Sequence, residues 1–298
     1  MPQPFHLRVP ATTANLGTGF DVLNMSLHLF NSFKVIPGAG RNHIVTQGAA
    51  GVPTDERNIF FHAYRAVFRR VRAKNIPVSV EAKVEIPLAR GLGSSAATYL
   101  AGAVAAQHVL GYPLSVEELM ALATELEGHP DNIVPAFCGG MAVIVREGKG
   151  VQLWHHHVHG LTAVLAIPEF KRSTAAARKL IPARVPLADA IYNLGRAAMF
   201  VGAVADRNYE MLRYAMQDAL HQRYRARRIP GLNDVVRAAI NAGACGAALS
   251  GSGPTMVALC THGPAPVATA MQRAFARHGV ACRCLTVAID NHGVRVRG

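Results

Sequence analysis

The chain has 298 residues, of which 50% are hydrophobic, and it carries a formal net charge of +13 at pH 7. That length and apolar content predict a globular protein with one large domain or two smaller ones. The apolar runs are interrupted by Gly, His or Arg before the roughly 18–20 residues that a membrane-spanning helix needs, and the first residues lack the apolar core of a secretory signal. The five scattered cysteines predict reduced thiols rather than disulfides or a zinc site, as expected in the cytoplasm.

The N-terminal half of the chain mixes strand and helix signals. Strands are predicted at residues 5–10, 27–36, 43–48 and 78–86. Apolar residues at helical spacing predict helices at residues 58–74, 94–111 and 115–128. Ser115 and Glu118 are placed as a capping box. Residues 139–160 are typical of a β-hairpin that turns at "EGKG", residues 147–150.

The C-terminal half begins with a core strand at residues 161–168. Helices are then predicted near residues 173–181, 187–204, 208–218, 231–242 and 264–278, and strands at 246–251, 255–261 and 282–289. The order of these elements predicts an α+β protein with two domains, residues 1–157 and 158–298.

The segment "PLARGLGSSAA", Pro87–Ala97, joins an apolar strand to an alanine-rich helix. Free backbone N–H groups at a helix start, close-approach glycines and two serine hydroxyls are suited to binding phosphate, although the segment lacks Gly-Lys-Ser/Thr. Its glycine spacing also matches the dinucleotide fingerprint, but a second helix follows the first, so the βαβ context of an oxidoreductase is missing. A plain glycine turn with a serine cap is the simplest alternative.

Three segments in this order resemble the motifs of the GHMP kinases. They are "VPATTANLGTGFD" (Val9–Asp21), the Pro87–Ala97 loop and "ALSGSGPTMVAL" (Ala248–Leu259). Further segments resemble the homoserine kinase branch, namely "EGHPDNIVPAFCGG" (127–140), "STAAARKLIP" (173–182) and "LHQRYRARRIPGL" (220–232). The resemblance implies a ribosomal-protein-S5-like N-terminal domain, a ferredoxin-like α/β sandwich as C-terminal domain, and use of ATP with Mg²⁺.

The resemblance also implies which residues hold the nucleotide and the metal. The nucleotide set is Asn58, near the adenine pocket, and Pro87, Arg90, Gly91, Leu92, Gly93, Ser94, Ser95, Ala96 and Ala97, around the triphosphate. Glu127 and Ser94 match the metal positions, and Glu125 is the alternative to Glu127. Oxygen ligands suit a hard cation that bridges the β- and γ-phosphates.

The same resemblance implies an amino-acid acceptor. Asn15 and Asp21 match positions around its ammonium and hydroxyl groups, and Arg178 and Arg225 match positions at its carboxylate, for which guanidinium is a bidentate partner. His129, Asp131 and Asn132 match the family's segment near the substrate. The implied catalytic set is Asp21, Glu127, Asn132 and Arg178. The expected reaction transfers the γ-phosphoryl group of ATP to the hydroxyl of L-homoserine, with Asp21 orienting that hydroxyl rather than acting as a dedicated base.

Other features are open to more than one interpretation. The histidines of residues 155–159 and the pair Cys282 and Cys284 are interpreted as structural. Another small-molecule kinase of the same superfamily is the nearest alternative function. The net charge of +13 makes an RNA-binding protein the alternative from a different class, although the basic residues are dispersed and we expect no nucleic-acid partner. A homodimer is a further expectation.

Overall fold

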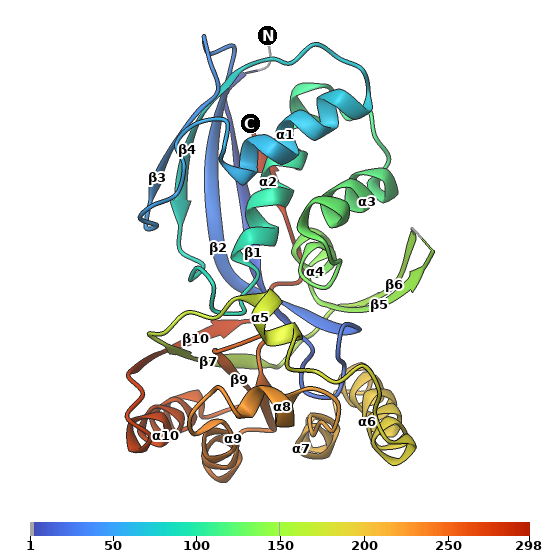
Figure 1. Ribbon diagram of the computed structural model, residues 1–298, viewed down its shortest axis with the longest axis vertical. Helices are drawn as coiled ribbons and strands as arrows, with labels where there is room; N and C mark the ends of the chain where they lie inside the picture. The colour runs from blue at the N-terminus through green and yellow to red at the C-terminus, as the bar shows by residue number, and fades with distance from the viewer. Residues whose placement is uncertain (1–2, 149) are drawn as a thin grey trace.

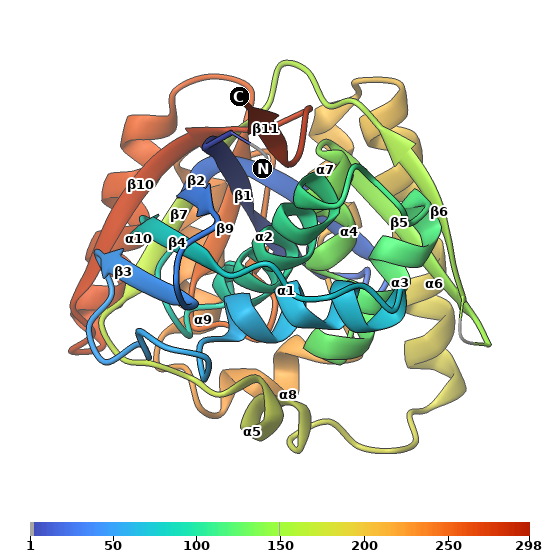
Figure 2. The same ribbon diagram turned by 90° about the horizontal axis from the view of Figure 1, so that it is seen from above.

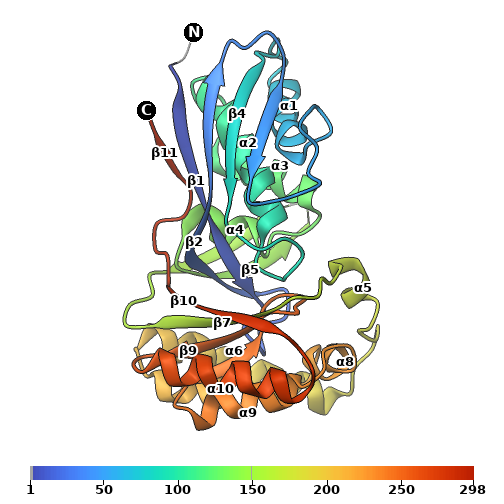
Figure 3. The ribbon, with the colours of Figure 1, turned by 90° about the vertical axis from the view of Figure 1, so that its left-hand side faces the viewer.

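The structure, a computed structural model, describes residues 3–148 and 150–298; Lys149 of the predicted hairpin turn lies outside the described residues. The first β-sheet runs along the long axis with helices on one face, and the second lies across its lower end with helices on the side away from the first sheet (Figures 1 and 3). The predicted α+β mixture is confirmed. No helix in the described ranges is long and apolar enough to cross a membrane.

The first sheet contains seven strands, in the order β11-β1-β2-β4-β3, with β5 on the other end of β2 and β6 beside β5. The strands are β1 (Phe5–Ala14), β2 (Leu23–Pro37), β3 (His43–Gln47), β4 (Val78–Val84), β5 (Met141–Glu147), β6 (Gly150–His156) and β11 (Arg295–Arg297). β2 is long enough to pair with β4 through residues 31–37 and with β5 through residues 23–25. It therefore runs the length of this sheet, and Leu27 forms an isolated bridge with Ile289 just after β10.

Four helices cover one face of the first sheet (Figures 2 and 3). They are α1 (Ile59–Arg70), α2 (Ser94–Val109), α3 (Val116–Glu127) and α4 (Ile133–Cys138). α2 is central, and alanines and glycine let it lie close to its neighbours: a Cβ on Gly102 would be 2.1 Å from the carbonyl oxygen of Phe60 in α1. The amino end of α2 consequently has a fixed position where the two sheets meet.

The second sheet is antiparallel, in the order β10-β7-β9-β8. Its strands are β7 (Thr162–Pro168), β8 (Gly246–Leu249), β9 (Met256–Cys260) and β10 (Cys282–Ala288). Its helices are α6 (Leu187–Ala205), the 3₁₀ turn η1 (Tyr209–Met211), α7 (Leu212–Ala215), α9 (Leu232–Asn241) and α10 (Pro264–Arg277). The short helix α5 (Thr174–Arg178) lies at the junction of the sheets, and the short helix α8 (Gln222–Ala226) lies lower, near α7 and α9 (Figure 1).

The structure differs from the predicted elements in several places. β1 and β2 extend into the N-terminal motif, leaving only residues 15–22 as a loop. The helix expected near 208–218 is a 3₁₀ turn followed by one turn of α-helix, and α4, α8 and β11 were not predicted. β11 pairs with β1, so the first sheet also takes a strand from beyond residue 158. The division at residues 157 and 158 stays a prediction.

Candidate active site

The loop before α2 is held between three segments of the chain. Thr12 in β1 donates its N–H to the carbonyl of Leu92, and the hydroxyl of Ser250 donates to the carbonyl of Gly91 at 2.7 Å. Gly91 and Gly93 have φ values of +75° and +71°, and a Cβ on either would lie 2.3 Å or less from Ser250 O or Thr12 Oγ1. The backbone therefore needs glycine at both positions, for its conformation and for its contacts.

The amino end of α2 has no side-chain cap. The first N–H groups of a helix have no partner within the helix, and the helix dipole makes this end positive. The side chains of Ala96 and Ala97 are buried in the core, and the N–H of Ala97 already donates to the carbonyl of Gly93. The groups that remain for an anion are the N–H groups of residues 93–96 and the hydroxyl of Ser94, because the hydroxyl of Ser95 donates to Glu127.

Arg90 holds the loop against the end of β7. Its Nε donates to the carbonyl of Pro168 at 2.7 Å, and its other nitrogens donate to the carbonyls of Leu88 and Glu169. Burial lowers the pKa of this guanidinium, and the nearby Arg283 lowers it further. Arg90 thus contacts carbonyl groups of the protein while lining the same cavity as the loop.

Glu127 lies at the end of α3, beside the start of α2. Its Oε2 accepts a hydrogen bond of 2.8 Å from Ser95 Oγ, and burial raises the pKa of its carboxyl group. Ser94, 5% exposed, lines the cavity with Glu127, whereas Glu125 is exposed and does not. Residues 3–148 and 150–298 contain no group of three or more His, Cys, Asp or Glu that could hold a metal alone.

A magnesium ion nevertheless fits this donor set. Mg²⁺ in kinases is held by one or two carboxylates, with phosphate oxygens and water completing its shell. Glu127 supplies a carboxylate and Ser94 a hydroxyl at the helix end where phosphate would bind. Three protein carboxylates are therefore unnecessary.

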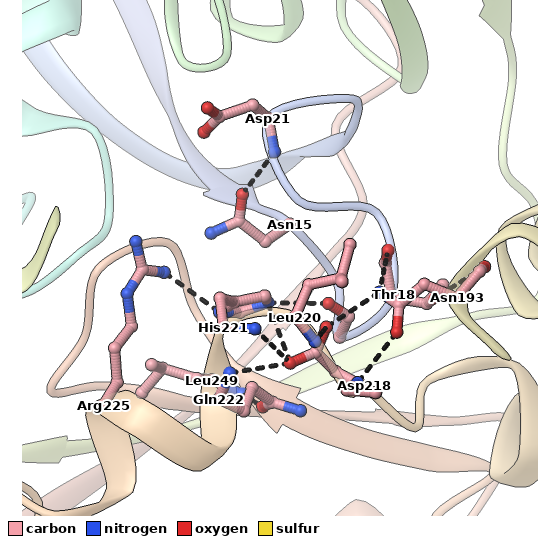
Figure 4. Close-up of polar contacts among 12 residues, drawn as sticks. Asn15, Thr18, Asp21, Asn193, Asp218, Leu220, His221, Gln222, Arg225 and Leu249 are labelled. Carbon is pink, nitrogen blue, oxygen red and sulfur yellow. Dashed lines mark hydrogen bonds and ion pairs between the residues drawn. The ribbon is translucent and has the colours of Figure 1, made fainter. Parts of the chain in front are cut away.

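Asn15 and Asp21 project from the loop between β1 and β2, both in the left-handed conformation, with φ of +73° and +61°. The Asn15 amide donates to the carbonyl of Gly251 at 3.0 Å, and its oxygen accepts the N–H of Asp21 at 3.0 Å (Figure 4). Both oxygens of Asp21 accept from Nη2 of Arg178 in α5 at 2.8 Å. Asp21 and Arg178, both of which the sequence predicted to bind the acceptor, thus form an ion pair with each other.

Arg225 in α8 is 3% exposed and has no carboxylate partner among the described residues. Its Nη1 donates to the carbonyl of Gly251 at 2.9 Å and contacts His221 Nδ1 at 3.1 Å. Burial lowers its pKa to about 10, which still leaves it cationic at neutral pH. A buried guanidinium of this kind favours an anionic ligand.

The segment before α4 contributes His129, Asp131 and Asn132. His129 Nδ1 pairs with Asp131, and this hydrogen bond raises the pKa of the imidazole. Asn132 donates to Asp131 at 3.1 Å and accepts the hydroxyl of Thr12 at 2.7 Å. Asn132 therefore links this segment to β1 next to Gly93.

One cavity of about 100 Å³ is lined by most of the predicted site residues. Its lining includes Asn15, Asp21, Pro87, Arg90, Gly91, Leu92, Gly93, Ser94, Ser95, Glu127, His129, Asn132, Arg178 and Arg225. Sequence reasoning gave no role to Thr174, Gly251 and Ser252, which also line it, although all three lie in segments used for the resemblance.

Asn58 lies in a neighbouring apolar cavity of about 160 Å³. Its amide caps α1 by accepting the N–H of Phe60 and donates to the carbonyl of Pro53 at 2.7 Å. The two cavities share Ala89, Ser94 and Ser95. A ligand with a flat apolar part and an anionic part could therefore occupy both.

Comparisons with known proteins show the family of the chain. The profile for the GHMP kinases N terminal domain matches residues 58–140, and that for GHMP kinases C terminal matches residues 199–277. A homoserine kinase of Moorella thermoacetica is 44% identical over 97% of this chain and 99% of its own length. One of Desulfitobacterium hafniense is 39% identical over 97% and 99%. The chain belongs to the homoserine kinase family of GHMP kinases.

The fold is also similar to those of solved kinase structures. The crystal structure of homoserine kinase from Cytophaga hutchinsonii, 27% identical, aligns with a TM-score of 0.90 over 100% of this chain and 98% of its own. The L. major mevalonate kinase, 16% identical, aligns with a TM-score of 0.72 over 95% of each chain. This GHMP kinase thus has the predicted two-domain family fold, and it shares that fold with kinases of other acceptors.

Proposed function

We propose that the protein transfers the γ-phosphoryl group of ATP to the side-chain hydroxyl of L-homoserine, forming O-phospho-L-homoserine for threonine biosynthesis. The observation that carries this proposal is the single cavity in which the start of α2 faces Asp21, Arg178 and Arg225. A phosphate-binding helix end and a set of groups suited to an amino-acid zwitterion thereby lie within reach of each other.

Two adjoining cavities support the proposed position of the nucleotide. The apolar cavity next to Asn58 accepts the base, and the glycine loop with Ser94 and Ser95 accepts the phosphates. Asn58 shapes the first of these cavities by fixing the start of α1, because its amide accepts the N–H of Phe60 and donates to the carbonyl of Pro53. Arg90 positions the loop through the end of β7.

Glu127 and Ser94 would hold Mg²⁺, which supplies positive charge to the phosphates during transfer. Glu127 now bonds to Ser95, so the same carboxylate can keep the helix end in place before the cation arrives. The protein's own contribution is to hold donor and acceptor in line and to stabilise the transferring charge.

The acceptor inserts at the Asp21–Arg178 ion pair. Its ammonium group takes the place of a guanidinium against Asp21 and Asn15, and its carboxylate is bound by Arg178 and Arg225. Arg178 is half exposed, on a short helix, so it can turn from one carboxylate to another at low cost. Asp21 orients the hydroxyl by accepting its hydrogen bond.

The test is an ADP-release assay with ATP, Mg²⁺ and a panel of small alcohols. L-homoserine should be the preferred acceptor, and the product should be identified by mass spectrometry. Preference for mevalonate or a sugar would instead assign the protein to another branch of the superfamily. A salt-sensitive gel shift with RNA, without kinase activity, would support the alternative from the different class.

We also propose that the protein is a homodimer of the cytoplasm with no nucleic-acid partner. α6 exposes an apolar stripe to solvent, with Leu187, Ile191 and Leu194 exposed by 76%, 61% and 73%. A Cβ on Gly195 or Gly202 would meet nothing within 4 Å. In the proposed dimer, the apolar stripe of α6 packs antiparallel against the same stripe of a second copy.

A further inference from the structure

A buried imidazole lies behind the acceptor site. His221, directly before α8, is 0% exposed. Its Nε2 is 2.7 Å from the carbonyl oxygen of Gly17, in the loop that carries Asn15 and Asp21, and its Nδ1 is 3.1 Å from Arg225 Nη1 (Figure 4). One ring therefore contacts both segments that are proposed to bind the acceptor.

The two partners determine the protonation of this ring. A guanidinium can only donate, so Nδ1 must accept; a carbonyl can only accept, so Nε2 must carry the proton. The imidazole is therefore neutral, with its hydrogen on Nε2. Its burial favours the same state by lowering its pKa to about 4.

The surroundings of His221 keep it in place. Asp218 accepts the backbone N–H groups of His221 and Gln222 at 2.8 and 2.6 Å, and Asn193 donates to it at 2.9 Å. The ring of Phe20 stacks on the imidazole at 5.2 Å between centroids. Phe20 also lies 5.3 Å from the guanidinium of Arg225 and 5.5 Å from that of Arg178.

Arg225 has one side bound and one side free. Nη1 uses its hydrogens on Gly251 and His221, whereas the buried Nε has no partner among the described residues. A guanidinium binds a carboxylate best through two neighbouring N–H groups. The contacts of Nη1 leave the edge formed by Nε and Nη2 for such a ligand.

We propose that His221 is a positioning residue for the acceptor's carboxylate. Its Nδ1 orients Arg225 so that the Nε–Nη2 edge faces the site, and its Nε2 ties the Asn15–Asp21 loop to the same ring. This inference rests on the proposed function, because it takes an amino-acid carboxylate as the ligand of Arg225.

Two variants separate the two ring nitrogens. In His221→Asn, the amide oxygen lies near the position of Nδ1 and can still accept from Arg225, while the contact to Gly17 is lost. In His221→Gln, the amide nitrogen can reach Gly17 in place of Nε2, while the acceptor for Arg225 is lost. Each variant loses one hydrogen bond at the same buried site, so each serves as the stability control for the other.

The measurements are kcat and KM for both substrates. We expect His221→Gln to raise KM for L-homoserine about tenfold or more, the effect of one lost bond to a charged group, and His221→Asn to raise it less than about threefold. KM for ATP should stay within about twofold in both. Equal effects of the two variants on KM for L-homoserine, or equal effects on both substrates, would show a merely structural role.

A carboxylate-free acceptor tests the same idea from the ligand side. L-homoserinol has the hydroxyl and the ammonium group of L-homoserine without its carboxylate. The wild type should prefer L-homoserine to this alcohol, and His221→Gln should lose about tenfold of that preference; an unchanged preference overturns the inference. If the wild type does not phosphorylate L-homoserine at all, the proposed function itself is wrong.

Nitrogen NMR of the histidine-labelled wild type tests the inference without any variant. His221 should show the neutral tautomer with hydrogen on Nε2 at pH 7.5. Its Nδ1 resonance should move when L-homoserine binds and not when L-homoserinol binds. A proton on Nδ1, or a resonance that does not respond to L-homoserine, contradicts the proposal.

Discussion

Asp21, which we propose binds the acceptor, already has a cationic partner within the protein. Its carboxylate is bound by Arg178 through both oxygens at 2.8 Å, and its N–H is bound by Asn15. Both side chains of the ion pair are more than a third exposed, so the pair is weak and exchangeable. The contacts with Arg178 and Asn15 thus hold Asp21 in position without the acceptor.

Asp21→Asn tests whether this residue orients the acceptor or takes its proton. The amide keeps the shape and one oxygen, so we expect kcat to fall by about tenfold. Steady-state kinetics over a range of pH measure this. A loss of roughly 10³-fold or more, with a changed pH profile, would show that Asp21 is a general base.

His221 also makes the stability of the protein depend on pH. Its pKa is lowered to about 4 in the folded state, against about 6.5 in an unfolded chain. The unfolded state therefore takes up more protons as the pH falls below 6.5, and this disfavours folding. Three charged groups face the ring: Asp218 in its own segment, Arg225 in α8 and Asp21 in the β1–β2 loop.

The expected effect is a loss of about 2 kcal/mol in the free energy of unfolding between pH 7 and pH 5 from this residue alone. Urea denaturation at both pH values measures it, with His221→Gln as the comparison. The variant should show a smaller difference between the two pH values than the wild type. An identical difference would mean that His221 has the same pKa in the folded protein as in the unfolded chain.

At the scale of secondary-structure elements, the loop before α2 is the most constrained segment. Gly93 has φ of +71°, and its Cβ position is 2.2 Å from Thr12 Oγ1. Gly111, after the same helix, has φ of +74° with nothing within 4 Å. The two glycines have the same backbone conformation but different surroundings. Gly111 is therefore a control for the effect of backbone conformation alone.

Gly93→Ala should lower kcat/KM for ATP by about a hundredfold, because an added methyl group displaces the phosphate loop from β1. Gly111→Ala should cost about 1 kcal/mol of stability from its backbone conformation and leave the kinetics unchanged. Kinetic assays and thermal unfolding of both variants provide the comparison. Normal ATP kinetics in Gly93→Ala would contradict the proposed phosphate loop.

The sequence predicted elements well where they are long and periodic. The helices α1, α2, α3, α6 and α10 match, and the capping box of Ser115 and Glu118 is present. α4 and β11 escaped prediction because six and three residues carry too little periodicity. β1 continues past Pro10, although a proline usually indicates that a strand ends. A bulge between Pro10 and Ala11 accommodates the proline.

The candidate site residues were predicted by motif resemblance. The residues that hold them in place, such as His221, were not predicted. The loop glycines and the acceptor residues lie in segments with recognisable spacing, so each could be named. His221 lies in one of these segments, but its partner Gly17 is 204 residues away. No local pattern reveals such a contact, because it exists only after the two sheets come together.

At the scale of the whole molecule, the proposed oligomer depends on α6. A lysine in the middle of its exposed stripe would place a charge in the interface between two copies. Leu194→Lys should therefore convert the dimer to a monomer with an unchanged fold, as measured by light scattering after gel filtration. A wild type that is monomeric at micromolar concentration would rule out the homodimer.

The pairing of β11 with β1 has a consequence for how the protein is made. His6–Arg8 belong to β1, the first described strand in chain order, and their partners Arg295–Arg297 follow every other described strand. The buried Asp290 holds that late segment by accepting bonds from Arg295 and from the N–H of Gly293. Because β11 is synthesised after the other described strands, β1 has only β2 as a neighbour until the ribosome has passed residue 297.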